Sequence, residues 1–343
     1  MEHRCILVTG GAGFIGSNFV RFLFETEPAI EIVNLDALTY AGNLASLGDC
    51  RNLPRHHFVR GSITNAELVR FLLQQYAVDG IVNFAAESHV DRSITGPQVF
   101  IETNVVGTLT LLAEARAACV TRFLQVSTDE VYGSLGRTGA FTETTPLSPN
   151  SPYSASKAAA DHLVLAYHHT HSMDAIITRC SNNYGPYQFP EKLIPLMIMN
   201  AGHDRPLPVY GDGLQVRDWL YVRDHCAAIW AAFQRGKPGE VYNFGGNNEK
   251  TNLDVVRLLL ERLGKPESLI TYVQDRPGHD RRYAIDAGKA RRELQWEPAV
   301  TFEQGMAATV DWYRGNTAWL DEVTSGEYQA YYEKIYGHRG RAS

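Results

Sequence analysis

The chain has 343 residues, of which 44% are hydrophobic and 20% charged, an ordinary composition for a globular protein with one large core or two modest domains. A formal net charge of −6, with no block of Lys or Arg, argues against nucleic acid as a partner. No apolar run approaches the ~20 residues that cross a bilayer, and five widely spaced cysteines without a C-x-x-C pair indicate reduced thiols. We therefore expect a cytoplasmic protein without a membrane partner.

The first predicted element is a buried strand, Cys5 to Val8, which runs into the sequence Gly10-Gly11-Ala12-Gly13-Phe14-Ile15-Gly16 and then into a helical pattern. A buried strand, a glycine turn and a helix form the context in which a glycine fingerprint indicates dinucleotide binding. A second predicted strand, residues 30–35, ends in Asp36, about 20 residues beyond Gly16. An acidic side chain there can accept hydrogen bonds from the adenosine ribose and would repel the phosphate of NADP, so the pattern predicts NAD.

Strands and helices continue to alternate through the first half of the chain. Predicted strands lie at residues 58–59, 80–84, 122–127 and 175–179, and predicted helices at 66–75, 97–118 and 154–171. This alternation predicts an α/β fold with a doubly wound parallel sheet of the Rossmann type, with ligands at the carboxyl ends of the strands. Ala85-Ala86-Glu87-Ser88, Thr128 and Asp129 directly follow such ends and should face the cofactor.

Beyond residue 180 the pattern loosens, and prolines and glycines mark short connections. Only a strand at 241–244 and an amphipathic helix at 252–263 are clearly predicted. We expect an NAD-binding domain over residues 1–180, completed by a segment that returns near 217–248. The remainder, residues 181–343, would form a smaller α/β substrate domain that closes over the cofactor.

Two segments carry groups that can handle protons. Asp129 and Glu130 are adjacent carboxyls, and Lys157 follows Tyr153 by four residues, which places both on one helix face. A nearby ammonium lowers the pKa of a phenol, so Tyr153 could take a proton from a substrate hydroxyl; the alternative is an ordinary surface pair. Adjacent carboxyls shielded from water disfavour double ionisation, so one can serve as an acid beside a basic neighbour, although a helix starting nearby would stabilise both anions.

Three histidines, at positions 168, 169 and 171, are crowded on the predicted helix 154–171. Side chains at such neighbouring positions point to different helix faces, and no cysteine or carboxylate cluster accompanies them. We therefore predict no metal site.

With the glycine fingerprint, Asp36 and Tyr-x-x-x-Lys in place, the chain resembles the extended short-chain dehydrogenase/reductase family. Longer strings narrow the resemblance to the dTDP-glucose 4,6-dehydratases within it. These strings are Leu35-Asp36-Ala37-Leu38-Thr39-Tyr40-Ala41-Gly42-Asn43, Ala85-Ala86-Glu87-Ser88-His89-Val90-Asp91-Arg92-Ser93, Ser127-Thr128-Asp129-Glu130-Val131-Tyr132-Gly133, Phe189-Pro190-Glu191-Lys192-Leu193-Ile194-Pro195 and residues 275–283. They extend from the second predicted strand to beyond residue 280.

The resemblance implies a lyase that acts on dTDP-glucose with tightly bound NAD and supplies deoxysugar (rhamnose-type) biosynthesis. Tyr153 would remove the proton of the 4-hydroxyl as hydride passes from C4 to NAD, and Lys157 would hold the nicotinamide ribose. Glu130 would then remove the C5 proton, and Asp129 would protonate the departing 6-hydroxyl. Thr128 would donate a hydrogen bond to the sugar, and hydride would return to C6.

The remaining site residues also come from the resemblance and from the fingerprint. For the cofactor they are Gly10, Gly13, Phe14, Ile15, Gly16, Asp36, Ala37, Leu38, Thr39, Ser62, Ile63, Phe84, Ala85, Ala86, Glu87, Ser88, Thr103, Tyr153, Lys157 and Asn183. For the substrate they are Ser88, Thr128, Asn182, Lys192, Leu193, Pro208, Val209, Tyr210, Arg217, Asn252, Asp275, Arg276, Pro277, Gly278 and His279. The family usually has an acidic residue at the position of Ser62 and Lys at that of Ala37, so the adenosine end should be held more loosely here.

Two alternatives stay open. A nucleotide-sugar 4-epimerase shares the fold, NAD, Tyr153 and Lys157, but needs no acid and base for C5 and C6, so Asp129 and Glu130 favour the dehydratase. A non-catalytic NAD-binding protein would need none of Tyr153, Lys157, Asp129 and Glu130. The sequence also does not decide whether the nucleotide base of the substrate is thymine or uracil. The family's usual assembly, through helices at 97–118 and 154–171, further predicts a homodimer.

Overall fold

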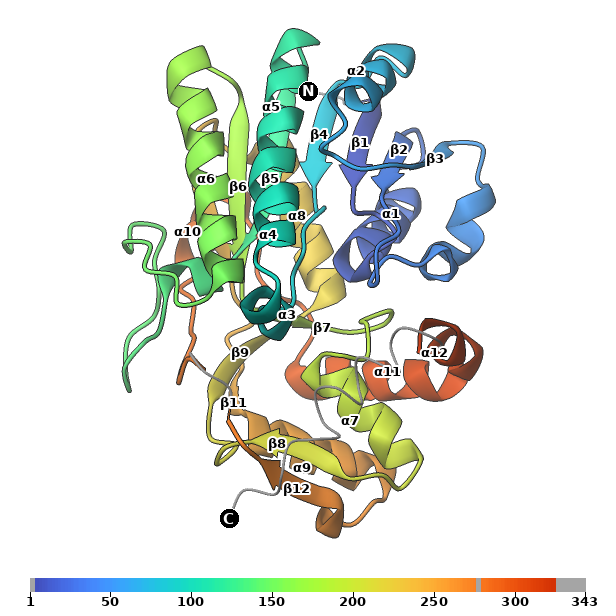
Figure 1. Ribbon diagram of the computed structural model, residues 1–343, viewed down its shortest axis with the longest axis vertical. Coiled ribbons are helices and arrows are strands. Elements are labelled where there is room, and N and C mark those ends of the chain that lie inside the picture. The colour runs from blue at the N-terminus through green and yellow to red at the C-terminus, as the bar shows by residue number, and fades with distance from the viewer. Residues whose placement is uncertain (1–3, 276–278, 325–343) are drawn as a thin grey trace.

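The computed structural model describes residues 4–275 and 279–324. A seven-stranded parallel sheet forms the centre of the larger lobe (Figure 1), with the order β10-β6-β5-β4-β1-β2-β3. Its strands are β1 (Cys5–Thr9), β2 (Glu31–Asp36), β3 (His56–Arg60), β4 (Gly80–Asn83), β5 (Arg122–Thr128), β6 (Ala175–Cys180) and β10 (Val241–Phe244). Every residue of β1, β5 and β6 is buried, as their apolar runs predict for strands covered on both faces. The predicted doubly wound α/β fold is confirmed.

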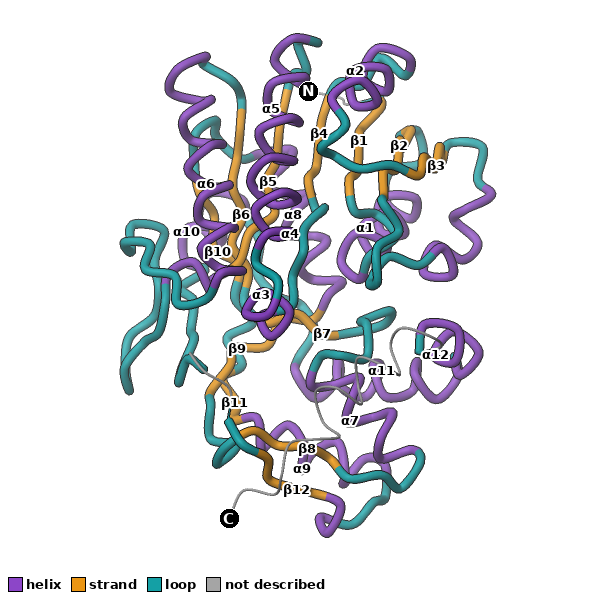
Figure 2. Tube along the Cα trace, in the orientation of Figure 1, coloured by secondary structure: helices purple, strands orange, loops and turns teal. Residues whose placement is uncertain are grey.

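Helices cover both faces of this sheet. On one face lie α1 (Phe14–Thr26), α8 (Val222–Arg235) and α10 (Gly288–Leu294), which pack onto β1 and β6 through one apolar core. On the other face lie α2 (Ala66–Gln75), α5 (Thr108–Ala117) and α6 (Pro152–His171), which form a second core. Figure 2 shows the strands of this sheet side by side across the larger lobe, flanked by these helices. Each of these helices therefore packs its apolar face against the sheet.

Two predicted helices differ in detail from the sequence pattern. The helix predicted over 97–118 consists of α4 (Gln98–Phe100), a π-helical segment η2 (Ile101–Gly107) and α5. The helix predicted from Ser154 begins two residues earlier, because Ser151 caps it in a reciprocal capping box with Ser154 and Pro152 occupies its first turn. A short helix, α3 (Val90–Thr95), crosses below α4 toward the smaller lobe (Figure 1).

Within the described residues, the smaller lobe combines two small sheets with four helices. The sheets are β11-β9-β7 and β12-β8, formed by β7 (Asn182–Tyr184), β8 (Leu207–Tyr210), β9 (Val216–Tyr221), β11 (Glu249–Thr251) and β12 (Ile270–Val273). The helices are α7 (Leu193–Gly202), α9 (Asn252–Leu263), α11 (Phe302–Gly315) and α12 (Thr317–Val323), which share one apolar core. Short 3-10 segments are η1 (Leu44–Asn52), η3 (Asp129–Tyr132) and η4 (Glu267–Leu269). Pro195 lies in the first turn of α7, where proline is tolerated.

The chain returns to the larger lobe after β9. α8 follows β9 directly, and β10 then pairs in parallel with β6 at the edge of the main sheet. This strand lies within the segment predicted to return near 217–248, while the domain limits at residues 180 and 181 stay a prediction. Within the described residues, no helix combines the length and the apolar content needed to cross a membrane.

Candidate active site

A cavity of about 370 Å³ opens at the carboxyl ends of the central strands, on the side that faces the smaller lobe. Its walls come from the ends of β1, β2, β4, β5 and β6, from α6, and from residues 188–192 of the smaller lobe. The strand order reverses between β1 and β4, and ligands of open parallel sheets bind at such a switch point. The cavity is therefore the candidate active site.

The glycines after β1 leave room for a diphosphate. Gly10 has φ +69, in the left-handed region, and a Cβ there would lie 2.7 Å from the backbone nitrogen of Ala85. A Cβ on Gly16 would lie 2.3 Å from the Gly10 carbonyl oxygen, so only glycine lets the turn pack against α1. Gly13, Phe14 and Ile15 line the cavity at the start of α1, where backbone N–H groups favour an anion. These residues fit the diphosphate of NAD.

Asp36 ends β2 at the far side of the cavity and is 7% exposed. Its Oδ2 accepts a hydrogen bond of 2.8 Å from the Ala12 backbone N–H, and its Oδ1 accepts one of 2.8 Å from Leu38. Burial raises the pKa of Asp36, and these two bonds oppose that shift. Leu38 itself does not line the cavity, contrary to the predicted contact, because its N–H turns back onto Asp36 and its side chain packs on the core.

The other predicted cofactor residues all line the cavity. They are Ala37, Thr39, Ser62, Ile63, Phe84, Ala85, Ala86, Glu87, Ser88, Thr103 and Asn183. Ser62 is partly engaged within its own turn, since its Oγ lies 2.8 Å from Thr64 Oγ1 and accepts a hydrogen bond from the Thr64 N–H. The cavity therefore contains the whole predicted set apart from Leu38.

The two carboxyls follow β5 in the short turn η3. Thr128 caps this turn by accepting a hydrogen bond of 3.2 Å from the Glu130 N–H. Asp129 is 2% exposed, and its Oδ2 has no hydrogen-bond partner among the described residues. Burial, and then the Glu130 carboxylate, raise the pKa of Asp129 well above its usual range, although Arg217 opposes this. Of the two adjacent carboxyls, Asp129 is therefore the one whose protonated form is favoured.

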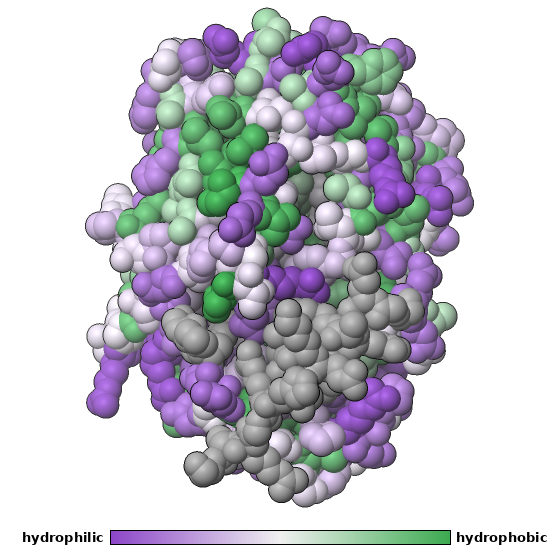
Figure 3. Space-filling model, viewed as in Figure 1, coloured by the Kyte–Doolittle hydropathy of each residue, from purple (hydrophilic) through white to green (hydrophobic). Residues whose placement is uncertain are grey.

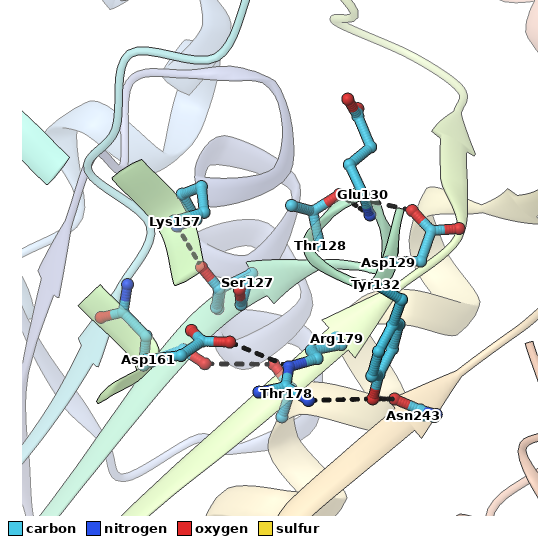
Figure 4. A network of polar contacts seen from close by, with 12 residues as sticks. Ser127, Thr128, Asp129, Glu130, Tyr132, Lys157, Asp161, Thr178, Arg179 and Asn243 are labelled. Atoms are coloured by element: carbon cyan, nitrogen blue, oxygen red, sulfur yellow. Dashed lines mark hydrogen bonds and ion pairs between the residues drawn. The ribbon is translucent and has the colours of Figure 1, made fainter. Parts of the chain in front are cut away.

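Tyr153 and Lys157 line the opposite wall, one turn apart on α6. We predicted that Lys157 lowers the pKa of Tyr153, but burial, followed by the Glu130 carboxylate, raises it well above its usual range. The Lys157 ammonium instead donates a hydrogen bond of 2.7 Å to the Val126 carbonyl oxygen, and burial lowers the pKa of Lys157 (Figure 4). Thr128 hydrogen-bonds Tyr153 and opposes the rise in the pKa of Tyr153. The phenol therefore lies next to the segment that carries Asp129 and Glu130.

The predicted substrate residues divide into two groups. Ser88, Thr128, Asn182 and Lys192 line the cavity, and the Lys192 ammonium donates to the Ser88 carbonyl oxygen at 3.1 Å. Leu193, Pro208, Val209, Tyr210, Arg217, Asn252, Asp275 and His279 belong to the smaller lobe and do not line it. Arg276, Pro277 and Gly278 lie outside the described residues.

Several residues of the second group still lie together. His279 Nδ1 lies 2.6 Å from Asp275 Oδ1, and the His279 ring is 6.1 Å from that of Tyr210. Arg217 donates to the Val216 and Asp280 carbonyl oxygens. Val209, by contrast, is 1% exposed, and its side chain packs in the core of the smaller lobe.

Sequence reasoning did not assign several residues that line the cavity. Cys180 and Ser181 follow the end of β6, and the rule that singled out Thr128 after β5 would have found them. Gln188 carries no such signal, because it comes from a loop of the smaller lobe whose position depends on the tertiary fold, whereas Glu191 of the same loop lies in a segment that resembles a thymidine-contacting segment of the family.

A Rossmann sheet with Tyr153, Lys157 and a carboxyl pair at its switch point defines an extended short-chain dehydrogenase/reductase. Residues 7–309 match the GDP-mannose 4,6 dehydratase family. The chain is 59% identical over 341 residues to a dTDP-glucose 4,6-dehydratase of Xanthomonas campestris pv. campestris (strain B100), which covers 94% of this chain and 97% of that protein. The chain belongs to the dTDP-glucose 4,6-dehydratase family.

Solved structures agree with this. The dTDP-glucose 4,6-dehydratase of Bacillus anthracis in complex with NAD is 55% identical, with a TM-score of 0.88, over 93% of this chain and 99% of that one. The Streptomyces venezuelae dTDP-glucose 4,6-dehydratase, also with NAD bound, is 52% identical, with a TM-score of 0.91, over the same shares of 93% and 99%. The similarity therefore covers both lobes.

Proposed function

We propose that this protein is a dTDP-glucose 4,6-dehydratase, which removes water from dTDP-glucose to give dTDP-4-dehydro-6-deoxy-glucose for deoxysugar biosynthesis. The observation that carries the proposal is the cavity in which Asp129 and Glu130 face the same space as Tyr153 and Lys157. NAD, when bound, accepts a hydride from C4 of the sugar and returns it to C6, so it is not consumed. Gly10, Gly13, Gly16 and Asp36 would hold its diphosphate and adenosine ribose.

Tyr153 takes the proton of the 4-hydroxyl in the first step. Tyr153 can accept this proton only as the phenolate, and burial makes that phenolate a strong base by raising its pKa. Thr128 hydrogen-bonds Tyr153 and stabilises the phenolate before the transfer. Lys157, fixed by the Val126 carbonyl oxygen, supplies a positive charge one turn away on α6.

The elimination step uses the two carboxyls of η3. Once C4 is a ketone, the neighbouring C5–H is acidic and Glu130 removes that proton. The C6–O bond breaks as Asp129 donates its proton to the departing hydroxyl, which leaves as water, and a C5–C6 double bond forms. The raised pKa of Asp129 supports its role as the acid. Glu130 then returns its proton to C5 as C6 receives hydride. Tyr153 has gained the proton of the 4-hydroxyl and Asp129 has lost one to the departing water, so transfer of one proton from Tyr153 to Asp129 through solvent resets both groups and balances the turnover.

A 4-epimerase remains the second candidate, and the buried Asp129 argues against it, because epimerisation at C4 needs no acid at C6. The deciding experiment is incubation of the purified protein with dTDP-glucose followed by mass spectrometry. We expect a product lighter by one water. An unchanged mass with conversion to the galactose isomer would support the epimerase, and no conversion would support neither.

Asp36 is expected to make the protein select NAD over NADP. A carboxylate at the adenosine ribose accepts hydrogen bonds from its hydroxyls and repels a 2′-phosphate. Asp36→Asn should weaken NAD binding by roughly tenfold or more, since hydrogen bonds to charged groups contribute about 1.5–3 kcal/mol. The same change should reduce the preference of the protein for NAD over NADP. Calorimetric titration of cofactor-stripped protein measures both affinities. Tighter binding of NADP than of NAD by the wild type would contradict this assignment.

We also propose that the protein is a homodimer of the cytoplasm. Four apolar side chains, Val99, Ile101, Val106 and Leu109, are 39–49% exposed on α4, η2 and α5. Figure 3 shows hydrophobic surface gathered over this region. Leu112 and Ala158, which lie on the two helices predicted to form the interface, are buried within the chain and add no exposed surface to it. All five cysteines are unpaired, which fits a reducing compartment.

The dimer is testable by light scattering. We expect a mass of about twice 38.2 kDa at micromolar concentration. Val106→Asp combined with Leu109→Asp should shift the mass toward one chain, because two charges would be buried without partners. Leu214→Asp, at an exposed position outside this surface, is the matched control. A wild-type mass of one chain would contradict the proposal.

A further inference from the structure

A buried ion pair lies directly behind the carboxyl-bearing turn, outside the cavity. The guanidinium of Arg179 donates from Nε to Asp161 Oδ2 at 2.8 Å, and the side chains are 3% and 0% exposed. Arg179 is on β6 and pairs in register with Ser127 of β5 and with Asn243 of β10. Neighbouring residues on parallel strands point to the same face, so Arg179 lies in the middle of a row of polar side chains under the active site (Figure 4).

The same guanidinium reaches the acid-base turn. Arg179 Nη1 donates to the Tyr132 hydroxyl at 3.0 Å, and that hydroxyl donates to Asn243 Oδ1 at 2.8 Å. The Tyr132 ring stacks on Phe141, with the ring centres 5.0 Å apart. Tyr132 is the last residue of η3, whose first residue is Asp129 and whose cap is Thr128. The turn is thus held at its start by its own cap and at its end by the ion pair.

Asp161 connects this arrangement to the other catalytic segment. It lies one turn beyond Lys157 on α6, and its carboxylate acts on Lys157 electrostatically. Lys157 in turn donates to the carbonyl oxygen of Val126, three residues before Asp129 on the chain. One ion pair therefore joins the helix that carries Tyr153 and Lys157 to the turn that carries Asp129 and Glu130.

Stability alone does not explain such a pair. Removing two charges from water costs several kcal/mol per ion, and an apolar replacement of similar volume is often neutral or stabilising. None of Tyr132, Asp161, Arg179 and Asn243 lines the cavity, so none of them touches the reacting atoms. What the network does provide is a fixed distance between two catalytic elements, and small displacements of catalytic groups are costly.

We infer that Tyr132, Asp161 and Arg179 are positioning residues that set the acid-base turn Asp129–Glu130 against the sugar held at Tyr153. This inference rests on the proposed dehydratase function. Because Tyr153 and Lys157 sit on the rigid α6, the C4 oxidation depends little on the Tyr132 hydroxyl. Elimination depends on it, since η3 is a short turn whose far end is held through that hydroxyl.

The test is Tyr132→Phe, which deletes the hydroxyl but keeps the ring and the Arg179–Asp161 pair. Turnover should fall by about 10- to 100-fold with KM for dTDP-glucose unchanged. The absorbance of enzyme-bound reduced nicotinamide should build up, and incorporation of solvent deuterium at C5 should slow. Tyr242→Phe is the matched control, because this buried phenol also takes part in two hydrogen bonds, with Lys237 and Glu293, but lies away from the turn.

Asn243→Ala, which removes the acceptor of the Tyr132 hydroxyl, should give the same pattern, and it keeps the test valid should Tyr132→Phe fold poorly. The inference is overturned if both variants lose oxidation and elimination equally, or if both turn over like the control while the wild type releases water normally. Absence of water loss from the wild type would instead overturn the proposed function. A merely structural network would lower the melting temperature in all three variants without accumulation of reduced nicotinamide.

Discussion

Tyr153→Phe is expected to lower turnover by roughly 10²- to 10⁴-fold, the range typical of losing a positioned general base. Without the phenol nothing accepts the proton of the 4-hydroxyl, so hydride does not leave C4. Neither enzyme-bound reduced nicotinamide nor the dehydrated product should accumulate after mixing with dTDP-glucose. Stopped-flow absorbance and mass spectrometry of the quenched mixture measure the two quantities.

The variant should remain folded and loaded with cofactor. The Tyr153 ring packs in a small cluster with Phe100 and Val90, at 6.3 Å between the ring centres of Tyr153 and Phe100, and phenylalanine keeps that packing. Unchanged NAD content and melting temperature would therefore assign the loss to chemistry. Product formation close to the wild-type rate would show that another group removes the proton.

Glu130→Gln and Asp129→Asn are expected to separate the two halves of the reaction. Both leave Tyr153 and Lys157 in place, so C4 oxidation should proceed and reduced nicotinamide should accumulate. Elimination should slow by roughly 10²- to 10⁴-fold. Glu130→Gln should also suppress deuterium exchange at C5, because that proton passes through its carboxylate. Asp129→Asn should leave the exchange measurable, since the base is intact.

The outcome also decides between the two candidate functions. If both carboxyl variants dehydrate dTDP-glucose near the wild-type rate, these side chains are structural and the epimerase becomes the stronger candidate. Glu249→Gln provides a matched control, because this exposed carboxylate pairs with Arg282 in the smaller lobe and its loss should leave every step unchanged. The comparison uses the same absorbance and exchange measurements.

The sequence predicted the larger lobe well because its strands and helices are locally encoded. Apolar runs such as Cys5–Thr9 and the glycines after it specify one strand and one turn, without reference to the rest of the chain. The π-helical segment around Thr103 was missed, because its apolar spacing is still helical. The carboxyl-end rule placed Thr128 and Asp129 in the cavity correctly, since strand ends meet at one edge of the sheet.

The pKa of Tyr153 was predicted with the wrong sign for a physical reason. Spacing on a helix shows that Lys157 and Tyr153 are close, but not that the ammonium turns to the Val126 carbonyl oxygen or that burial dominates. The predicted substrate residues of the smaller lobe, such as Val209 and Arg217, do not line the cavity, and their contact with the substrate stays a prediction. Their orientation depends on contacts between distant segments, which no local pattern encodes.

The late arrival of β10 in the main sheet has a consequence for biosynthesis. β6 is complete at residue 180, but its edge stays unpaired until residues 241–244 have left the ribosome. Between residues 180 and 241 the ribosome synthesises the first strands of the smaller lobe. The two lobes therefore fold together rather than one after the other. A nascent chain stalled near residue 180 would present an apolar β6 edge to other chains, a template for aggregation. We expect chaperone dependence to peak over that stretch of translation.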